Sequence, residues 1–379
     1  MRLCMSIAEL REEARRRVPR ALFEYADCGA YDQVTLRRNR AAFDDIELRQ
    51  RVMIDISRRS VATTVLGEPW SMPVAIAPTG LTGLFHRDGE IEGALAAEAC
   101  GVPFALSTMS ICSIEDVRAA TRQPFWFQLY LLKDRGFNED MVARARAAGC
   151  SALMLTADLV LQGVRRRDAH NGLTIPPRLT LANALDILTK PRWALGVLLG
   201  QRRSFGNLAG RVQASDGLGT LSQWIASQSD CSITWRQVEW LRSVWPAKII
   251  VKGILDPEDA RLAVAAGVDA LVVSNHGGRQ LDGAAASISA LPEVVEAVGG
   301  RCEVLFDGGV QCGQDVLKAL ALGARACLVG KSFLYGLAAG GRAGVTRMLE
   351  LLRAELEVSM ALCGVTDVRD VDARVLRRR

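Results

Sequence analysis

The sequence lacks several patterns that define common protein classes. It has no uncharged apolar run near the roughly 18 residues that a membrane span needs, so we predict no span. It has no GxGxxG motif, which leaves a nicotinamide site on a Rossmann fold unsupported. Nothing in it resembles a nucleic-acid-binding module, and we predict neither a nucleic-acid partner nor a metal site.

Ten cysteines are present, but none forms a CxxC pair. Several, including Cys100, Cys150 and Cys327, lie in apolar or alanine- and glycine-rich runs. Buried, unpaired thiols of this kind are typical of proteins in reducing compartments. We therefore predict reduced cysteines and a cytoplasmic protein.

The net charge is small, +5, and much of it lies in two short segments, 15–20 and 374–379. Apolar residues make up 49% and charged residues 23%, which is typical of a globular chain with a large core. The basic segments fit solvated ends of the chain, or alternatively a weak attraction to anionic lipid or substrate.

Eight short apolar runs recur along the chain, and most are followed by an amphipathic, alanine-rich stretch. Near-continuous aliphatic runs are typical of parallel strands that are covered on both faces. Strands that alternate with helices in this way predict an α/β fold, a (β/α)₈ TIM barrel. The predicted strands are 74–78, 103–107, 125–130, 152–156, 248–252, 270–274, 303–307 and 327–331, and the predicted helices are 88–100, 114–121, 137–148, 257–266, 287–298 and 313–322.

Two segments lie outside this repeat, and we treat the chain, 1–379, as a single domain that contains both. Residues 1–60 form an N-terminal extension that begins helical. Residues 170–235 form a long insertion between strands four and five, and such insertions are usually lids, oligomer contacts or mobile loops. Within it, "WALGVLLG" (193–200) is alternatively a membrane-surface contact, as part of the stretch 186–215.

Every predicted strand ends in hydrogen-bonding side chains or in a glycine-containing turn. In a (β/α)₈ barrel these ends converge on one face, where active sites are built. A ring of such ends predicts the site of a large polar ligand. Its residues are Pro78, Thr79, Ser107, Gln128, Tyr130, Thr156, Asp158, Lys252, Ser274, His276, Asp307, Gly330 and Lys331.

The last two strand ends indicate a phosphate. "DGGVQCGQD" (307–315) and "VGKS" (329–332) place glycines before helices, where backbone N–H groups and the helix N-terminus bind anions. Lys331 adds a full positive charge. The spacing from Gly323 to Gly330 does not match the GxxxxGK[ST] loop of an ATPase, so we exclude that class.

His276 stands in the polar turn "SNHGGRQLDG" (274–283). A neutral imidazole accepts a proton near pH 7, and Arg279 can hold a carboxylate with two parallel hydrogen bonds. Arg165 is a second candidate for the same anion, and Asp158 is a candidate to orient the imidazole. A base beside a carboxylate clamp predicts proton removal from a 2-hydroxy acid.

Lys252 allows three interpretations. It caps a strand, forms a Schiff base as in an aldolase, or is a fixed cation beside the ring of a flavin. The two other histidines, His86 and His170, we assign to turns or to the surface.

These residues resemble those of the FMN-dependent 2-hydroxy-acid dehydrogenases and oxidases, a family that includes L-lactate dehydrogenase, glycolate oxidase and mandelate dehydrogenase. The resemblance extends from "VPRALFEYADCGAYDQVTLRRNRAAFDDI" (18–46) to "ALCGV" (361–365) and covers nearly the whole chain. "SNHGGRQLDG" is among its most specific motifs, and the bacterial L-lactate and mandelate dehydrogenases are the most similar members. The resemblance implies FMN-dependent oxidation of an L-2-hydroxy acid, foremost L-lactate, with L-mandelate or an oxygen-using oxidase as alternatives.

The resemblance also implies a role for each residue of the site, with His276 taking the hydroxyl or α-carbon proton of the acid. The implied catalytic residues are His276, Asp158, Tyr130 and Lys252. The implied substrate ligands are Tyr25, Tyr130, Arg165, Arg279 and His276. The implied FMN ligands are Pro78, Thr79, Gly80, Ser107, Gln128, Thr156, Lys252, Ser274, Asp307, Gly308, Gly309, Gln311, Gly330 and Lys331.

Two departures from the family pattern fall where the FMN phosphate is expected. Gln311 and Lys331 each replace an arginine of the family, which removes bidentate contacts. We therefore predict weaker FMN retention than is usual. Gly80 and Met109 leave room beside the flavin for an acid larger than glycolate, and by resemblance Gly80 favours a dehydrogenase over an oxidase.

The implied partners are the small 2-hydroxy acid, a quinone or another electron acceptor, and further copies of the chain in a homotetramer. The implied location is cytoplasmic, with peripheral contact on the inner face of the cytoplasmic membrane. A Schiff-base aldolase acting through Lys252, and a barrel that binds FMN without catalysis, stay open as alternatives.

Overall fold

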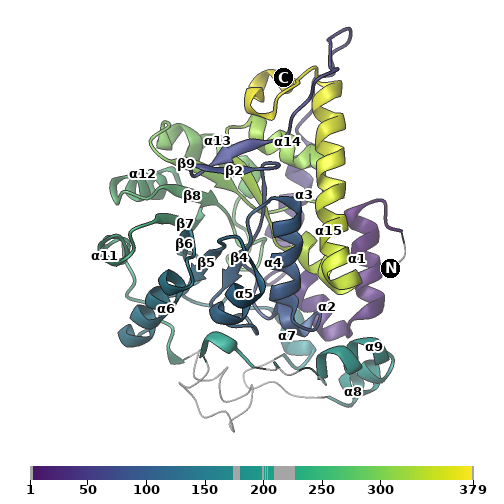
Figure 1. Cartoon of the computed structure of the whole chain (residues 1–379), viewed down its shortest axis with the longest axis vertical. Coiled ribbons are helices and arrows are strands. Elements are labelled where there is room, and N and C mark those ends of the chain that lie inside the picture. Colours follow the sequence, from purple (N-terminus) through teal and green to yellow (C-terminus); the bar gives the residue numbers. More distant parts are fainter. Residues whose placement is uncertain are drawn as a thin grey trace.

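The eight apolar runs form one parallel sheet in the order β3-β10-β9-β8-β7-β6-β5-β4. A bridge between Ile76 and Phe104 joins the first strand to the last, so the sheet closes into the predicted barrel (Figure 1). The computed structural model describes residues 3–173, 180–198, 200, 202, 204–208 and 227–377. The barrel strands are β3 (Val74–Ile76), β4 (Ala105–Ser107), β5 (Trp126–Leu129), β6 (Ala152–Thr156), β7 (Lys248–Ile254), β8 (Ala270–Val273), β9 (Glu303–Phe306) and β10 (Ala326–Val329).

Helices surround the barrel, and the six predicted from the sequence are all present within two residues of their expected bounds. Their apolar faces pack on the outer side chains of the strands, which explains why the strands are almost wholly buried. The surrounding helices are α4 (Gly89–Cys100), α5 (Ile114–Ala120), α6 (Arg135–Ala147), α11 (Arg236–Val244), α12 (Pro257–Ala265), α13 (Ser287–Val298), α14 (Gly313–Ala321) and the bent α15 (Lys331–Leu362).

A short hairpin plugs the amino-terminal end of the barrel. It consists of β1 (Thr63–Val65) and β2 (Glu68–Trp70), and the Trp70 ring lies 5.5 Å from that of Trp126 on β5. The hairpin shares a buried cluster with small inward-facing residues such as Ala75, Ala105 and Ala152. The interior at this end is therefore filled by side chains, and the polar strand ends lie at the other end.

The N-terminal extension contains α1 (Ile7–Arg17), α2 (Arg20–Asp27) and α3 (Val34–Asp44), and α1 packs along α15 (Figure 1). Its contact with the barrel depends on Gly278, whose φ is +72°. A Cβ at Gly278 would lie 2.6 Å from the backbone nitrogen of Leu36, so only glycine permits this approach. The Ala30 N–H also donates to the Gly278 carbonyl at 2.8 Å. These contacts hold the end of α2 beside the loop after β8.

The insertion between β6 and β7 contributes α7 (Arg166–His170), α8 (Leu181–Leu188), α9 (Pro191–Trp193), η2 (Ala194–Leu198) and η3 (Gly206–Leu208). In Figure 1, α7, α8 and α9 lie at the end of the molecule opposite the C-terminal segment. Among the described residues, no helix is long and apolar enough to cross a membrane. The segment expected to form a lid, 170–235, lies partly outside the described residues, since 174–179, 199, 201, 203 and 209–226 are not among them.

Candidate active site

The polar residues predicted at the strand ends are brought together at the carboxyl end of the barrel, as parallel closure of the sheet requires. They come from every barrel strand. Pro78, Thr79 and Gly80 follow β3, Ser107 ends β4, Gln128 and Tyr130 lie in and after β5, Thr156 and Asp158 lie in and after β6, Lys252 lies in β7, Ser274 and His276 follow β8, Asp307, Gly308, Gly309 and Gln311 follow β9, and Gly330 and Lys331 follow β10.

His276 and Asp158 form a hydrogen-bonded pair, with 3.0 Å between Nδ1 and Oδ1. Burial raises the pKa of Asp158, but the neighbouring His276 and Lys252 outweigh burial and hold it below its usual value. The carboxylate is therefore ionised, so Nδ1 carries the hydrogen and Nε2 is left as the acceptor. Burial lowers the pKa of His276, and Asp158 only partly offsets this, so the imidazole is neutral at pH 7.

The backbone of His276 has φ of +58°, an uncommon conformation for a residue with a side chain. Its N–H donates to the Ser274 hydroxyl at 3.0 Å. Asn275 and Asn39 of α3 exchange two amide hydrogen bonds, 2.7 and 2.8 Å long, and Asn275 also accepts from the Gly278 N–H. Asn39 and Asn275 are not among the residues predicted from the sequence, although Asn275 stands inside the "SNHGG" motif.

Lys252 of β7 binds groups that follow the next two strands of the sheet, β8 and β9. Its ammonium donates to the Ser274 hydroxyl at 2.8 Å and lies 3.0 Å from the Asp307 carboxylate. Burial lowers the pKa of Lys252, but Asp307 and Asp158 more than compensate and raise it above its usual value. A Schiff base requires a neutral amine, so this environment favours a fixed cation over the aldolase interpretation.

Arg279 and Arg165 both lie over the ring of Tyr25, at 4.7 and 6.0 Å from its centre. Arg279 also donates to the carbonyls of Tyr25 and Cys28, which ties it to the end of α2. Burial and the neighbouring Arg165 lower the pKa of Arg279. The positive charges of the two guanidinium groups repel each other in this partly buried site. A bound anion relieves that repulsion, so the site favours a carboxylate.

Tyr130 lies beside this group at the end of β5, and its N–H donates to the Thr108 hydroxyl at 3.1 Å. Burial, Asp158 and Tyr25 raise the pKa of Tyr130 well above its usual value. Its phenol stays protonated and is a hydrogen-bond donor at neutral pH.

Unpartnered polar atoms mark where a ligand fits. Among the described residues, seven buried side-chain nitrogen or oxygen atoms lack a hydrogen-bond partner, and five of them belong to the predicted site. Buried polar atoms are seldom left unsatisfied, so this concentration indicates that a polar ligand belongs here. The five are Thr79 Oγ1, Gln128 Nε2, Asp158 Oδ2, Arg165 Nε and Asp307 Oδ1. A flavin ring and ribityl chain supply both donors and acceptors, so Thr79, Gln128 and Asp307 fit FMN.

The end of the site where the FMN phosphate is expected carries less positive charge than the family pattern would give it. Lys331 donates to the carbonyls of Asp27 and Cys28 at 2.7 and 3.1 Å, and burial, with Arg279, lowers its pKa to about 7. Gln311 is exposed and its N–H donates to Asp315. Neither residue carries a guanidinium, and weak phosphate binding at this end of the site stays a prediction.

The glycines of the same loop are required by packing. Gly309 has φ of +97°, and a Cβ there would lie 2.6 Å from the carbonyl oxygen of Asn39. Arg40 of α3 binds the Gly309 carbonyl at 3.0 Å and forms an ion pair with Asp315. This loop is therefore held by the N-terminal extension as well as by its own strand.

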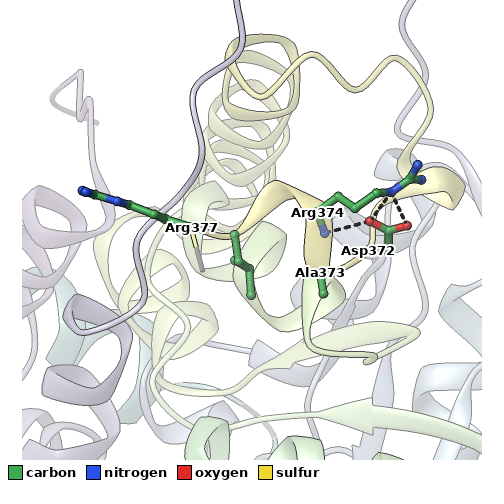
Figure 2. Close-up of a pocket in the computed structure, with 5 residues that line it drawn as sticks. Asp372, Ala373, Arg374 and Arg377 are labelled. Carbon is green, nitrogen blue, oxygen red and sulfur yellow. Dashed lines mark hydrogen bonds and ion pairs between the residues drawn. The ribbon is translucent and has the colours of Figure 1, made fainter. Parts of the chain in front are cut away.

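A cavity near the C-terminus, about 400 Å³, contains none of the predicted site residues (Figure 2). It is lined by Asp372, Ala373, Arg374, Leu376 and Arg377. Its charged groups are already paired, Arg374 with Asp372 and Arg377 with Glu47. His86 lies in the turn before α4 and His170 is exposed at the end of α7, as predicted.

Comparison with known proteins supports this assignment. The family model "FMN-dependent dehydrogenase" matches residues 14–378. The L-lactate dehydrogenase of Caulobacter vibrioides (strain NA1000 / CB15N) is 48% identical over 375 residues, covering 99% of this chain and 98% of that protein. The L-lactate dehydrogenase of Ectopseudomonas mendocina (strain ymp) is 46% identical over 369 residues, covering 97% of each.

Solved structures give the same result for the fold. A structure of the monotopic membrane protein (S)-mandelate dehydrogenase superposes with a TM-score of 0.94, at 37% identity and with 100% of both chains covered. A structure of mandelate oxidase gives a TM-score of 0.85, also at 37% identity, covering 100% of this chain and 99% of that one.

Proposed function

The chain belongs to the FMN-dependent dehydrogenase family, and from this premise we propose that it oxidises an L-2-hydroxy acid to the 2-oxo acid, with L-lactate as the main substrate. The observation that carries the proposal is the neutral His276, bonded to Asp158, beside the paired guanidinium groups of Arg165 and Arg279.

The protein residues divide the work between binding and proton transfer. Arg279 and Arg165 bind the carboxylate of the acid, and the phenols of Tyr25 and Tyr130 donate to its oxygens. The Nε2 atom of His276 accepts the hydroxyl or α-carbon proton of the 2-hydroxy acid, and Asp158 stabilises the imidazolium that results. FMN, when bound, supplies the acceptor for the two electrons that leave the α-carbon.

Three residues with unpartnered polar atoms would hold FMN, namely Thr79, Gln128 and Asp307. Lys252 is a fixed positive charge between Ser274 and Asp307, and it would stabilise negative charge that develops on the ring. Ser107 donates to Gln128 at 3.0 Å and orients its amide.

An anaerobic bleaching assay tests the proposal. Purified protein, saturated with FMN, is mixed without oxygen with L-lactate, L-mandelate and glycolate in turn, and loss of yellow colour is recorded. L-lactate should bleach the protein fastest. H276Q should bind FMN but bleach at least about a hundredfold more slowly, because one general base typically contributes this much. H170Q, which changes an exposed histidine, is the matched control and should behave as wild type.

Other results would redirect the assignment. Faster bleaching by L-mandelate would make this a mandelate dehydrogenase. A yellow protein that no 2-hydroxy acid bleaches would be a non-catalytic member of the family. A colourless protein that borohydride traps through Lys252 in the presence of a carbonyl substrate would be an aldolase.

We further propose peripheral contact with the cytoplasmic face of a membrane, through α8. Leu181, Leu185 and Leu188 share one face of this helix and are 79%, 56% and 76% exposed. Leu195 of η2 is 64% exposed, and Arg192 between them is basic. An apolar helix face with adjacent basic residues fits the surface of an anionic bilayer, where a quinone acceptor is dissolved.

Co-sedimentation with phosphatidylglycerol vesicles tests this contact. Wild type should sediment with the vesicles, and the L181S/L185S/L188S variant should stay in solution while it still bleaches with L-lactate. Equal sedimentation of both proteins would contradict the proposal.

A quinone analogue should restore the yellow colour of the bleached protein faster than oxygen does. We also propose a homotetramer, which sedimentation velocity would test.

A further inference from the structure

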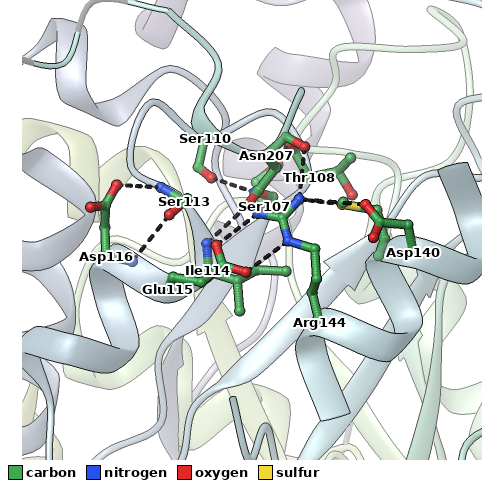
Figure 3. Close-up of polar contacts among 11 residues, drawn as sticks. Ser107, Thr108, Ser110, Ser113, Ile114, Glu115, Asp116, Asp140, Arg144 and Asn207 are labelled. Atoms are coloured by element: carbon green, nitrogen blue, oxygen red, sulfur yellow. Dashed lines mark hydrogen bonds and ion pairs between the residues drawn. The ribbon is translucent and has the colours of Figure 1, made fainter. Parts of the chain in front are cut away.

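The loop that joins β4 to α5, residues 108–113, is held in place by a side chain of the insertion. Asn207 of η3 is 1% exposed, and its amide oxygen accepts from the Ile114 N–H at 2.9 Å. Its amide nitrogen donates to the Ser110 hydroxyl at 2.9 Å, with longer contacts of 3.3 and 3.4 Å to the Ser107 and Thr108 carbonyls. Figure 3 shows Asn207 among these groups.

The backbone on either side of Asn207 is fitted to the same loop. The Gly206 N–H donates to the Ser110 carbonyl at 3.1 Å, and a Cβ at Gly206 would lie 2.6 Å from the Ser113 nitrogen. The Asn207 carbonyl accepts from Arg144 of α6 at 3.1 Å. Phe205 and Leu208, which flank this pair, are 6% and 1% exposed. This part of the insertion is therefore buried against the barrel.

The loop that Asn207 holds carries Met109 to the site. The Met109 N–H donates to the Ser107 hydroxyl at 3.1 Å, and the Met109 carbonyl accepts from the Leu81 N–H at 2.9 Å. A Cβ on Gly80 would lie 3.1 Å from the Met109 carbonyl oxygen and 3.2 Å from its Cβ. Met109 thus lies directly against Gly80, beside the predicted flavin position.

A second buried group holds the far side of the loop. The carboxylate of Glu90, which is 1% exposed, accepts from the N–H groups of Gly83, Ile111 and Cys112. Glu90 belongs to α4 of the barrel itself, so its support does not depend on the insertion. The insertion acts on the Met109 loop through the side chain of Asn207 and through the Gly206 N–H.

We propose that Asn207 is a positioning residue that sets the size of the acid pocket by holding Met109 against Gly80. The proposal rests on the proposed function, since Met109 bears on selectivity only if the acid is bound there. Met109 is unbranched and flexible, so its position depends on the backbone that carries it. Without the amide of Asn207, the backbone around Met109 loses the hydrogen bonds to Ile114 and Ser110 that hold it in place. We expect the Met109 side chain, and with it the wall of the acid pocket, to move outward.

The choice of asparagine follows from the partners. They comprise one N–H donor and three oxygen acceptors, and a primary amide presents an acceptor and two donors at one site. Aspartate would keep the bond to Ile114 but lose every donor. Alanine would lose both kinds of bond and leave buried backbone groups unsatisfied.

The test compares kcat/KM for a series of acids of increasing size, namely L-lactate, L-2-hydroxybutanoate, L-2-hydroxyisocaproate and L-mandelate. Each variant is saturated with FMN before the assay, so differences in flavin occupancy do not enter. In N207A, the ratio of kcat/KM for the largest acids to that for L-lactate should rise about tenfold, the scale of discrimination that one methylene group gives in an apolar pocket. N207D should shift this ratio in the same direction.

The matched control is N183A. Asn183 also lies in the insertion, and its amide donates to the Asn171 carbonyl at 2.7 Å, away from the loop after β4. N183A should leave the ratio at the wild-type value even if it lowers the melting temperature. A merely structural role for Asn207 would lower the melting temperature without moving the ratio.

The outcomes separate the two proposals. If wild type bleaches with L-lactate but the ratio is unchanged in N207A and N207D, the role of Asn207 is overturned and the proposed function stands. Wild type that oxidises no acid overturns the proposed function. If N207A does not fold, N207D decides; failure of both to fold shows that Asn207 supports the fold, which also overturns the proposal.

Discussion

The Nδ1 atom of His276 lies 3.0 Å from the Oδ1 atom of Asp158, across the ends of two strands that are not neighbours in the sheet. The hydrogen of this bond belongs to the imidazole, because the pKa of Asp158 is held low. The pair therefore fixes which ring nitrogen faces the acid. It also supplies a negative charge that offsets the positive charge His276 acquires on accepting a proton.

D158N should change both the rate and its pH dependence. Only the neutral imidazole accepts a proton, so kcat/KM of wild type falls as pH decreases through the pKa of His276, which lies below 6.5. Asp158 raises this pKa, so its removal lowers it further and moves the acidic limb to lower pH. The rate on the plateau should fall about 10²- to 10⁴-fold. Stopped-flow bleaching between pH 4.5 and 8 measures both effects, and an acidic limb that moves upward would contradict this account.

K252M should destabilise the protein strongly. It removes one partner of a buried ion pair and leaves Asp307 without its cation, which typically costs about 3–5 kcal/mol in the free energy of unfolding. Urea denaturation of the FMN-free protein measures the loss. The matched control is K248M, because Lys248 pairs with Asp269 at the same distance of 3.0 Å but is 47% exposed. That substitution should cost less than about 1 kcal/mol.

G278A should weaken binding of the acid. The substitution places a Cβ 2.6 Å from the Leu36 nitrogen in a left-handed conformation, so α3 and the end of α2 must move away. Tyr25 moves with them, and we expect a higher KM for L-lactate. G283A is the control, since Gly283 has φ of +88° but no atom within 4 Å of the added Cβ. It should lower stability by about 1–2 kcal/mol and leave KM unchanged.

Q311R should increase FMN retention. The added guanidinium restores a bidentate phosphate ligand at a position where the present side chain is exposed and uncharged. The ratio of flavin to protein after gel filtration should rise relative to wild type. A wild-type protein that is already saturated after the same treatment would refute the prediction of weak retention.

The barrel and most of the site were open to prediction because both depend on local patterns. Continuous apolar runs identified the strands, and closure of a parallel sheet then brings their polar ends together, Lys252 and His276 included. The role of Tyr25 required the family resemblance, because nothing local indicates that α2 reaches the loop after β8, which carries Arg279.

The contacts of Asn207 and Lys331 were beyond sequence reasoning. Asn207 binds groups about a hundred residues earlier in the chain, and its neighbours in sequence carry no periodic signal. Lys331 was expected at the phosphate, yet its ammonium donates to carbonyls at the end of α2. The direction of a flexible side chain depends on which acceptors the tertiary fold places within its reach.

The hairpin that carries Trp70 closes the amino end of the barrel, and this affects how substrate and product enter and leave the enzyme. With Trp70 and Trp126 packed across that end, we expect the acid, its product and an electron acceptor to reach the site from the carboxyl end of the barrel. A bulky acceptor is then expected to approach only after the oxo acid has left. Release of the oxo acid, rather than chemistry, is the step that we expect to limit turnover with such an acceptor.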